Sequence, residues 1–461
     1  MPTKGNGVFL LNCPMADDSC ENNIQLHRIV MQNKLYASYS LVRKFLLTKQ
    51  PALLSILEWL LLSMVIALCV GSACAFFLIS LEYATDYRNA HEWIIYLLPL
   101  AGILLGYVFY RWGKEIAPGN NLVISNIHKP KKIIPFRLAP FILGGTVFTH
   151  LFGGSAGREG TAIQMSAAIS DQLTRLFKLS KYNRQIVLIS GMSAGFGAVF
   201  GTPFAGAIFG LEVYHMGKIK YNAIFPAFAS SFMADYVTRS YGVSHSHYIL
   251  GLVPDINMQG FLITILAGIC FGLVALSFIK LTSSYSKLSS KYIKRAYMRP
   301  FFGGLLILAI AALLGTTKYL GLGLPTIVES FTVQQAPYVF FFKLLLTAIT
   351  LGAGFKGGEV TPLFFIGAAL GSALSLFLPL PVGLLAAMGF VAVFAGASNT
   401  PLASSIMAIE LFGIVCSPYV AIACIVAYLI SGHHGIYSSQ VIGDAKSVTK
   451  LRETGKSLAD V

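Results

Sequence analysis

The chain has 461 residues, of which 55% are hydrophobic and only 11% are charged, and its net charge is +15. Several of its apolar stretches exceed the roughly 20 residues that a helix needs to cross a bilayer. This pattern excludes a soluble domain, and a β-barrel would show short alternating segments instead. We therefore predict one all-α polytopic membrane domain, with apolar stretches at 52–81, 92–110, 186–214, 259–281, 301–322, 337–354, 362–395 and 402–431.

The excess of Lys and Arg has an ordinary explanation in such a protein, because these residues gather in cytoplasmic loops. We place the densest basic run, 283–300, in the cytoplasm, together with the basic loop around Lys129. The charge does not indicate a nucleic-acid partner, although a basic surface also attracts anionic substrates. The seven cysteines have no metal-ligand spacing, so we predict neither a metal nor a cofactor.

The organisation along the chain follows from these segments. Residues 1–30 lack a convincing secretory signal, because their FLL run is too short, and we expect a flexible tail unless the true start is near Met31. The remaining segments are predicted as a first repeat, a basic cytoplasmic linker, a second repeat and a short cytoplasmic tail, at 31–282, 283–300, 301–445 and 446–461.

Two motifs recur at nearly the same separation, which indicates an internal duplication. GREGT at 157–161 and GGEVT at 357–361 share G-x-E-x-T, and their glutamates are 359 − 159 = 200 residues apart. TPFAGAIFGLE at 202–212 and TPLASSIMAIE at 400–410 share T-P-x-A-x-x-I-x-x-x-E, and 410 − 212 = 198. Internal repeats with inverted topology are common in transporters.

The first motif pair is typical of broken helices that begin inside the membrane. The first amides of a helix have no partner within it, and they lie at its positive dipole end. An anion can bind there, and glycine lets the backbone approach it closely. Glu159 then stands where an anion would bind, so its carboxylate can occupy the site when ionised and leave it when protonated. The alternative is that Glu159 only favours the helix dipole, with Arg158 as a surface partner.

These motifs resemble those of the CLC family of chloride channels and anion/proton exchangers over roughly 50–440. GREGT is similar to the family's GREGP element, GGEVTP at 357–362 stands in place of GGIFAP, and FGTPFAGAIFGLE at 200–212 resembles the helix of its F-x-A-P-L-A-G pattern. GHHGIYSS at 432–439 resembles the stretch with the family's anion-binding tyrosine, here Tyr437. The resemblance implies a CLC-type fold with broken re-entrant helices meeting at the membrane midplane, and a homodimer with one pore per subunit.

Departures from the family pattern narrow the resemblance to bacterial CLC-type fluoride/proton antiporters. The GSGIP loop is missing, and Asn120 in APGNNLVISNIH takes the place of its serine, with Asn121 as the other candidate. The usual internal glutamate would fall at Val213, which cannot carry a proton. Glu359 stands where GGIFAP has an isoleucine. The resemblance thus implies fluoride export in exchange for protons; a chloride/proton exchanger or a passive chloride channel is the alternative.

The predicted site combines the duplicated Gly-Glu motifs with the family resemblance. Glu159 and Glu359 are the gating and proton-coupling groups, and the predicted anion-binding residues are Asn120, Arg158, Gly160, Val360, Thr361 and Tyr437. The expected partners are fluoride or chloride, protons, the lipid bilayer and a second copy of the chain. The expected location is the bacterial inner (plasma) membrane, with both termini cytoplasmic.

Simpler readings of individual residues remain open from sequence alone. Glu359 could be a helix-start Glu neutralised by Lys356, the asparagines could be helix N-caps, and Tyr437 could be an interfacial tyrosine. Glu212, Glu410 and His150 are predicted to be structural: the glutamates bond backbone groups or basic loop residues, and the histidine is buried. An enzyme is not expected, because the sequence has no GxSxG, HExxH or paired intramembrane aspartates.

Overall fold

This computed structural model describes residues 18–130, 132–246 and 248–461, with side chains described from residue 53 onward. Residues 1–17 of the predicted N-terminal tail lie outside the described residues. The chain divides into two units, 1–60 and 61–461. The first unit is helical from Asp18, and the second holds all the elements after α1.

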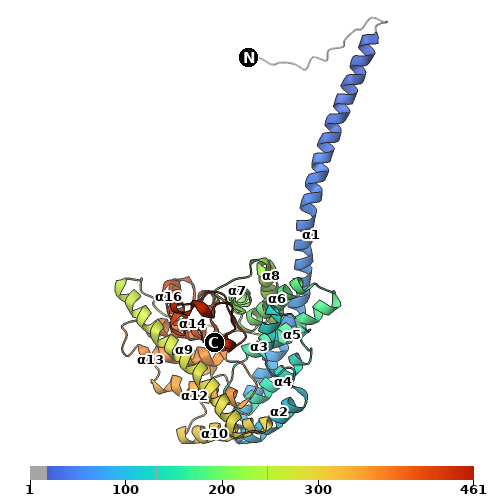
Figure 1. Cartoon of the computed structure of the whole chain (residues 1–461). Coiled ribbons are helices and arrows are strands. Elements are labelled where there is room, and N and C mark those ends of the chain that lie inside the picture. The colour runs from blue at the N-terminus through green and yellow to red at the C-terminus, as the bar shows by residue number, and fades with distance from the viewer. Residues whose placement is uncertain (1–17, 131, 247) are drawn as a thin grey trace. The chain divides into compact units, whose positions relative to one another are not determined.

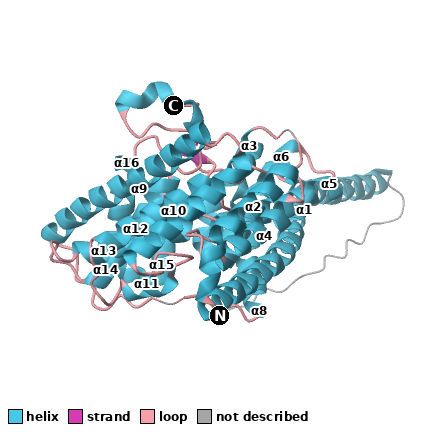
Figure 2. Cartoon of the chain, turned by 90° about the horizontal axis from the view of Figure 1, so that it is seen from below, coloured by secondary structure: helices cyan, strands magenta, loops and turns pink. Residues whose placement is uncertain are grey.

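The described structure is mostly helical, as predicted (Figure 2). The helices before residue 241 are α1 (Asp18–Ala90), α2 (Leu98–Trp112), α3 (Asn120–His128), α4 (Leu138–Leu151), α5 (Glu159–Leu176), α6 (Lys181–Phe200), α7 (Pro203–Glu212) and α8 (Ile224–Ser240). Those after it are α9 (Met258–Tyr292), α10 (Arg299–Leu314), α11 (Leu324–Glu329), α12 (Tyr338–Ala353), α13 (Val360–Leu374), α14 (Val382–Ser398), α15 (Pro401–Phe412) and α16 (Ser417–Ile430).

The order of the helices reproduces the repeat found in the sequence. α5 and α13 carry the Gly-Glu motifs and are the fifth helix of each series, while α7 and α15 carry the Thr-Pro motifs and are the seventh. Helices α3 to α6 lie on one side of the second unit, and α9, α13, α14 and α16 lie on the other (Figures 1 and 2). This order favours a boundary at 241–257. The predicted linker 283–300 does not coincide with this boundary. Its residues 283–292 form the end of α9.

Several apolar stretches that read as continuous are broken into shorter helices. Among the described residues, four helices are long and apolar enough to cross a membrane: Leu53–Ala90, Glu92–Trp112, Met258–Tyr292 and Ala296–Leu314. The stretch 186–214 instead divides into α6 and α7, because Gly201 ends α6 with φ +71° and Pro203 begins α7. The stretch 362–395 divides into α13 and α14, and the stretch 402–431 divides into α15 and α16. Exposed residues, including Phe377 and Ile414, lie at these two breaks, whereas Thr202 between α6 and α7 is buried.

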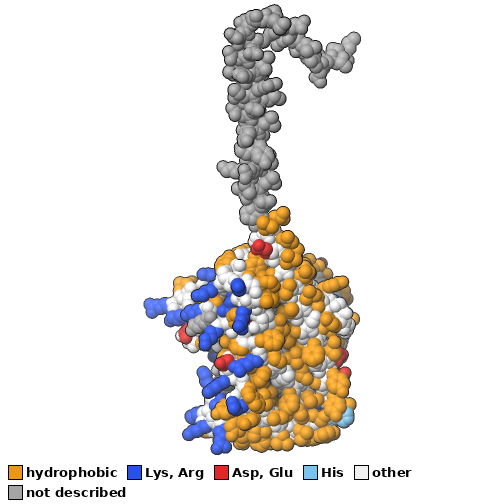
Figure 3. All heavy atoms as spheres, turned by 90° about the vertical axis from the view of Figure 1, so that its right-hand side faces the viewer, with side chains coloured by type: hydrophobic (Ala, Val, Ile, Leu, Met, Phe, Trp, Pro, Cys, Tyr) orange, Lys and Arg blue, Asp and Glu red, His pale blue; other side chains and the backbone are white. Residues whose placement is uncertain are grey.

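The surface of the second unit separates apolar from basic side chains. In Figure 3, hydrophobic side chains cover a broad face, and Lys and Arg gather along one edge. The exposed apolar side chains include Leu104, Tyr107 and Tyr110, which suits contact with lipid. The core lies along α5, α6, α13 and α14, whose residues are nearly all buried.

The ends of α7 and α15 hold each other by reciprocal hydrogen bonds. Glu212, at the end of α7, accepts hydrogen bonds from the backbone N–H groups of Leu402 (3.1 Å) and Ala403 (2.9 Å) at the start of α15. Glu410, near the end of α15, accepts hydrogen bonds from Phe204 N (3.0 Å) and Ala205 N (2.7 Å) at the start of α7. These amides have no partner within their own helices. The prediction that both glutamates bond backbone groups is confirmed.

The loops that enter α5 and α13 meet as a short antiparallel bridge. Gly157 N donates to Gly358 O at 2.6 Å, and Gly358 N donates to Gly157 O at 2.7 Å. A Cβ added at Gly358 would lie 2.6 Å from Gly160 N, so only glycine allows this approach. The bridge brings the starts of both helices together. A second link is the parallel pair of β1 (His215–Met216) and β2 (Val441–Ile442), which joins the end of α7 to the C-terminal segment.

We predict that Glu212→Ala destabilises the fold by about 2–3 kcal/mol, because two buried N–H groups lose a charged acceptor. Thermal unfolding in detergent should show a clearly lower midpoint. Glu329→Ala is the matched control, since Glu329 is half-exposed and forms a surface ion pair with Lys318. Equal midpoints for the two variants would contradict this role of Glu212.

We predict that Gly358→Ala loosens the bridge, because the added Cβ has no room beside Gly160 N. Overpacking at such a site costs about 1–3 kcal/mol. Hydrogen exchange should become faster at the amides of Gly157 and the start of α13. Gly144→Ala in α4 is the control, because a Cβ at Gly144 has no atom within 4 Å among the described residues. Unchanged exchange in Gly358→Ala would show that the bridge tolerates a side chain.

Candidate functional site

The carboxylate of Glu159 lies at the N-terminus of α13 rather than at the surface. Its Oε2 accepts hydrogen bonds from the N–H groups of Thr361 and Arg158, both at 3.1 Å, and its Oε1 accepts the Thr361 hydroxyl at 2.5 Å. Only 1% of the Glu159 side chain is exposed. The negative charge also faces the positive end of the α13 dipole. The carboxylate thus uses the donors that a small anion would need.

Unpartnered polar atoms gather around this carboxylate. Among the described residues, Asn120 Oδ1, Glu359 Oε2 and the Tyr437 hydroxyl are buried without a hydrogen-bond partner. A Cβ added at Gly160 would lie 3.2 Å from both Asn120 Nδ2 and Glu359 Oε2, so these two groups meet over Gly160. The Glu159 and Glu359 carboxylates interact electrostatically with each other and with Tyr437. The structure therefore brings the predicted residues together.

Individual contributions differ within this set. Val360 is fully buried and offers only its backbone, at the first position of α13. Arg158 Nε lies 3.4 Å from Glu159 Oε1, so the guanidinium and the carboxylate form an ion pair. Thr361 contributes both its N–H and its hydroxyl. Thr161, its counterpart on α5, bonds instead to the Thr146 hydroxyl at 2.6 Å.

The asparagines are not helix N-caps, which corrects one sequence alternative. Gly119 is the N-cap of α3, and no side chain caps this helix within the described part of the chain. Asn121 Oδ1 accepts a hydrogen bond from Ser439 N at 2.9 Å, so it ties α3 to the C-terminal segment. Asn120 is the residue whose amide borders Gly160. Gly119 takes the cap position because its φ of +59° favours glycine.

Two further alternatives are wrong. Tyr437 is 2% exposed, so it is a buried residue and not an interfacial tyrosine. Lys356 does not neutralise Glu359: its Nζ lies 4.5 Å from the centroid of the Phe109 ring, and no ion pair joins it to Glu359 in the described structure.

His150 is buried as predicted, with its two ring nitrogens 2.8 and 2.9 Å from backbone carbonyl oxygens of Thr146 and Ala156.

The C-terminal segment that carries Tyr437 is fixed by contacts that the sequence did not indicate. Gln440 Nε2 donates to Val213 O at 2.8 Å, and Asn399 Nδ2 donates to Gln440 Oε1 at 2.9 Å. Lys446 Nζ donates to Asn399 Oδ1 and to Tyr428 O, both at 2.6 Å. The left-handed φ of +60° at Asn399 cannot be read from a motif. These bonds hold Tyr437 at the site from the ends of α7, α14 and α16.

A hydrogen bond between two side chains holds this segment in place further along the chain. His433 bonds through Nδ1 to the Glu453 carboxylate, and its Nε2 accepts a hydrogen bond from Lys446 N at 3.0 Å. The His433 ring beside Glu453 holds the pKa of that carboxyl below its usual value. His433 lies in the loop after α16, and its side chain is buried.

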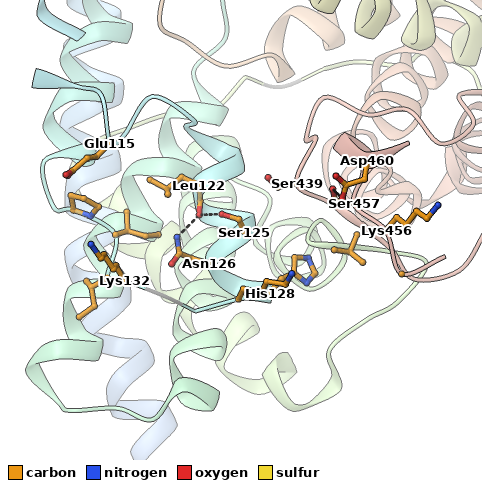
Figure 4. Close-up of a pocket in the computed structure, with 16 residues that line it drawn as sticks. Glu115, Leu122, Ser125, Asn126, His128, Lys132, Ser439, Lys456, Ser457 and Asp460 are labelled. Atoms are coloured by element: carbon orange, nitrogen blue, oxygen red, sulfur yellow. Dashed lines mark hydrogen bonds between the residues drawn. The ribbon is translucent and has the colours of Figure 1, made fainter. Parts of the chain in front are cut away.

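A cavity of about 820 Å³ lies between the flank of α3 and the C-terminal segment (Figure 4). Leu122, Ser125 and His128 line one side, and Ser439 and Lys456 line the other. Its charged lining residues are Lys129, Lys132 and Lys456, with Glu115 and Asp460 of opposite charge, and we call this cavity the basic groove. The bond between Asn121 and Ser439 lies at one end of this basic groove, beside Asn120.

Glu159 also lines a second, much smaller pocket. This pocket has a volume of about 20 Å³ and includes Arg158, Thr361 and Tyr248. It is enclosed further by the aromatic side chains of Phe200, Phe364 and Phe390. A volume of this size suits a single small ion or water molecule. Glu159 therefore contacts a small space lined by both polar and aromatic side chains.

The arrangement has no feature of a metal centre within the described ranges, where no cluster of three His, Cys, Asp or Glu side chains occurs. Its groups are hydrogen-bond donors around two carboxylates. Such a site can hold an anion and exchange protons.

Comparisons with known proteins agree with this chemistry. The family model described as "Voltage gated chloride channel" matches residues 101–432. The chain is 50% identical over 404 residues to the chloride/fluoride channel protein of Pseudomonas syringae pv. tomato, covering 86% of this chain and 89% of that protein. It is 24% identical over 435 residues to a proton/chloride exchange transporter of Vibrio vulnificus, covering 86% and 91%.

Solved structures show the same architecture. The crystal structure of a CLC-type fluoride/proton antiporter superposes with a TM-score of 0.81 at 36% identity, covering 83% of this chain and 97% of that one. A slow cyanobacterial chloride/proton antiporter superposes with a TM-score of 0.72 at 20% identity, covering 81% and 94%, and shares the fold. The site places two carboxylates and several neutral donors where the repeated helices meet. Together with the family match and the relatives above, this shows that the chain belongs to the CLC family of voltage-gated chloride channels and anion transporters.

Proposed function

We propose that the chain exports fluoride in exchange for protons, with Glu159 as the gate. The observation that carries this proposal is the position of the Glu159 carboxylate on the N–H and hydroxyl of Thr361. A fluoride ion needs the same donors, so carboxylate and fluoride compete for them. Relatives named for fluoride at 50% and 36% identity support this choice of anion.

The proposed coupling follows from charge. A protonated Glu159 is a weaker acceptor than a carboxylate, so protonation favours its departure from the α13 donors. Fluoride then takes its place, and deprotonation brings the carboxylate back and expels the ion. Glu359 adds a second carboxylate beside the same space. The carboxylates of Glu159 and Glu359 together with fluoride would place three negative charges in one buried site. Because these charges repel each other, uptake of a proton assists fluoride entry.

The donor set suits fluoride, which is small and a strong hydrogen-bond acceptor. Thr361 offers N–H and O–H, Asn120 offers an amide, and the buried Tyr437 hydroxyl has no other partner among the described residues. The proton route does not use Val213, whose side chain cannot carry a proton. One alternative is a chloride/proton exchanger, which the 24% identical Vibrio relative favours. The other alternative is a passive chloride channel, which would lack the proton coupling.

The proposed setting is the bacterial inner (plasma) membrane with both termini in the cytoplasm. The basic residues Lys287, Lys291 and Arg295 near the end of α9 are exposed, and basic loops favour the cytoplasmic side. We also propose a homodimer. Exposed apolar side chains on α7, α8, α15 and α16, including Phe204, Phe232, Leu402 and Ile425, offer a surface for it.

We predict that purified protein in liposomes releases fluoride faster than chloride and takes up protons at the same time. In Glu159→Ala, proton uptake should fall by about a hundredfold, because no carboxylate alternates with the anion. Fluoride-loaded and chloride-loaded liposomes are compared by recording anion efflux and proton uptake together.

Glu329→Ala serves as the control, because Glu329 lies in a surface ion pair away from the site. Chloride efflux as fast as fluoride efflux would assign the protein to the chloride exchangers or channels. Proton uptake that survives in Glu159→Ala would remove Glu159 from the coupling.

A further inference from the structure

The side-chain amide of Gln164 is buried outside the candidate site. Gln164 lies on α5, five residues after Glu159, and its side chain is 5% exposed. Within the described structure, Gln164 Oε1 makes no hydrogen bond. A buried polar atom left unpaired costs free energy, so such a group needs a physical explanation.

The amide of Gln164 lies against the start of α3. A Cβ added at Gly119, the N-cap of α3, would be 3.0 Å from Gln164 Oε1 and 3.3 Å from Nε2. The next residue, Asn120, is 8% exposed and carries another unpartnered amide oxygen among the described residues. Two buried amides thus meet at one helix N-terminus, whose first N–H groups have no partner within the helix.

Gly160 and Gln164 share one face of α5, because they are four residues apart. Asn120 Nδ2 borders Gly160, and Gly119 borders Gln164. The start of α3 therefore lies against this face, with Asn120 near Glu159 and Gly119 farther along α5. Further along α5, Asp171 Oδ2 accepts a hydrogen bond from Ile134 N at 2.7 Å, and Ile134 lines the basic groove. Gln164 thus lies on α5 between the gate and the wall of the groove.

We propose that Gln164 is an anion-contacting residue that donates its amide N–H groups to fluoride as the ion moves between the basic groove and the gate. This inference rests on the proposed function. A glutamine amide has two N–H donors, and rotation of the amide exchanges the places of nitrogen and oxygen. The donors can then face the N-terminus of α3 at Gly119, where the helix dipole also favours a negative charge.

The structural alternative is that Gln164 only packs between α3 and α5. The two roles predict opposite results for Gln164→Met, which keeps the length of the side chain and removes its donors. If Gln164 contacts fluoride, the concentration of fluoride at half-maximal flux should rise about tenfold, as for the loss of one hydrogen bond to an ion. The unfolding midpoint should stay equal or rise, because an unpaired amide is replaced by an apolar group.

The experiment measures fluoride flux against fluoride concentration in liposomes, the number of protons exchanged per fluoride, and thermal unfolding in detergent. Gln172→Met is the matched control on the same helix, because Gln172 Nε2 already donates to Ile134 O at 2.9 Å and to Ala168 O at 2.8 Å. That variant should lower the unfolding midpoint and leave the half-maximal concentration unchanged. The proton-to-fluoride ratio should stay at the wild-type value in both variants.

The outcomes separate the inference from the proposed function. Wild-type protein that moves no fluoride overturns the proposed function before any variant is compared. Wild-type protein that moves fluoride, together with a Gln164→Met protein that has the same half-maximal concentration, overturns only the role of Gln164. A lower midpoint with unchanged transport in Gln164→Met would assign Gln164 to packing.

Discussion

The fold depends on one constraint, which is that a helix starting inside an apolar protein must find acceptors for its first amides. Carboxylates supply them at three helix starts in this chain. Glu212 and Glu410 bind the starts of α15 and α7, and Glu159 binds the start of α13. The first two glutamates lie near the ends of helices that pack against each other. Glu159 instead begins a helix and lines a small pocket, which offers its side chain a second position.

This difference separates the structural carboxylates from the proposed gate. The reciprocal glutamates, the Gly157–Gly358 bridge and the β1–β2 pair join distant parts of the chain by backbone contacts. The Gly157–Gly358 bridge fixes the N-termini of α5 and α13 against each other, so it holds the Thr361 donors beside Glu159. A site with fixed donors spends little free energy on rearrangement when an anion replaces the carboxylate. The C-terminal segment adds the Tyr437 hydroxyl to the same fixed frame.

Much of this arrangement could be predicted from sequence, because its signals are local. Glycine and proline mark the helix starts, and the repeat separations near 200 residues pair the motifs. Contacts with distant partners could not be predicted. Asn121 bonds to Ser439, Lys356 lies over Phe109, and Lys446 reaches Asn399, and no periodic pattern encodes any of these pairs. Gln164 was missed for the same reason: its significance lies in the missing partner beside Gly119, which only the folded chain reveals.

The nature of the donors also bears on release. A lysine or arginine placed directly on a small anion in a dry site would hold it with a full charge, whereas transport needs binding weak enough to be reversed. Here the ammonium of Lys356 is placed over an aromatic ring, and the guanidinium of Arg158 is paired with Glu159. The nearest donors are an amide, a hydroxyl and backbone N–H groups. In the proposed mechanism, the returning carboxylate competes with fluoride for the Thr361 donors, and the same hydrogen bonds that close the gate release the fluoride.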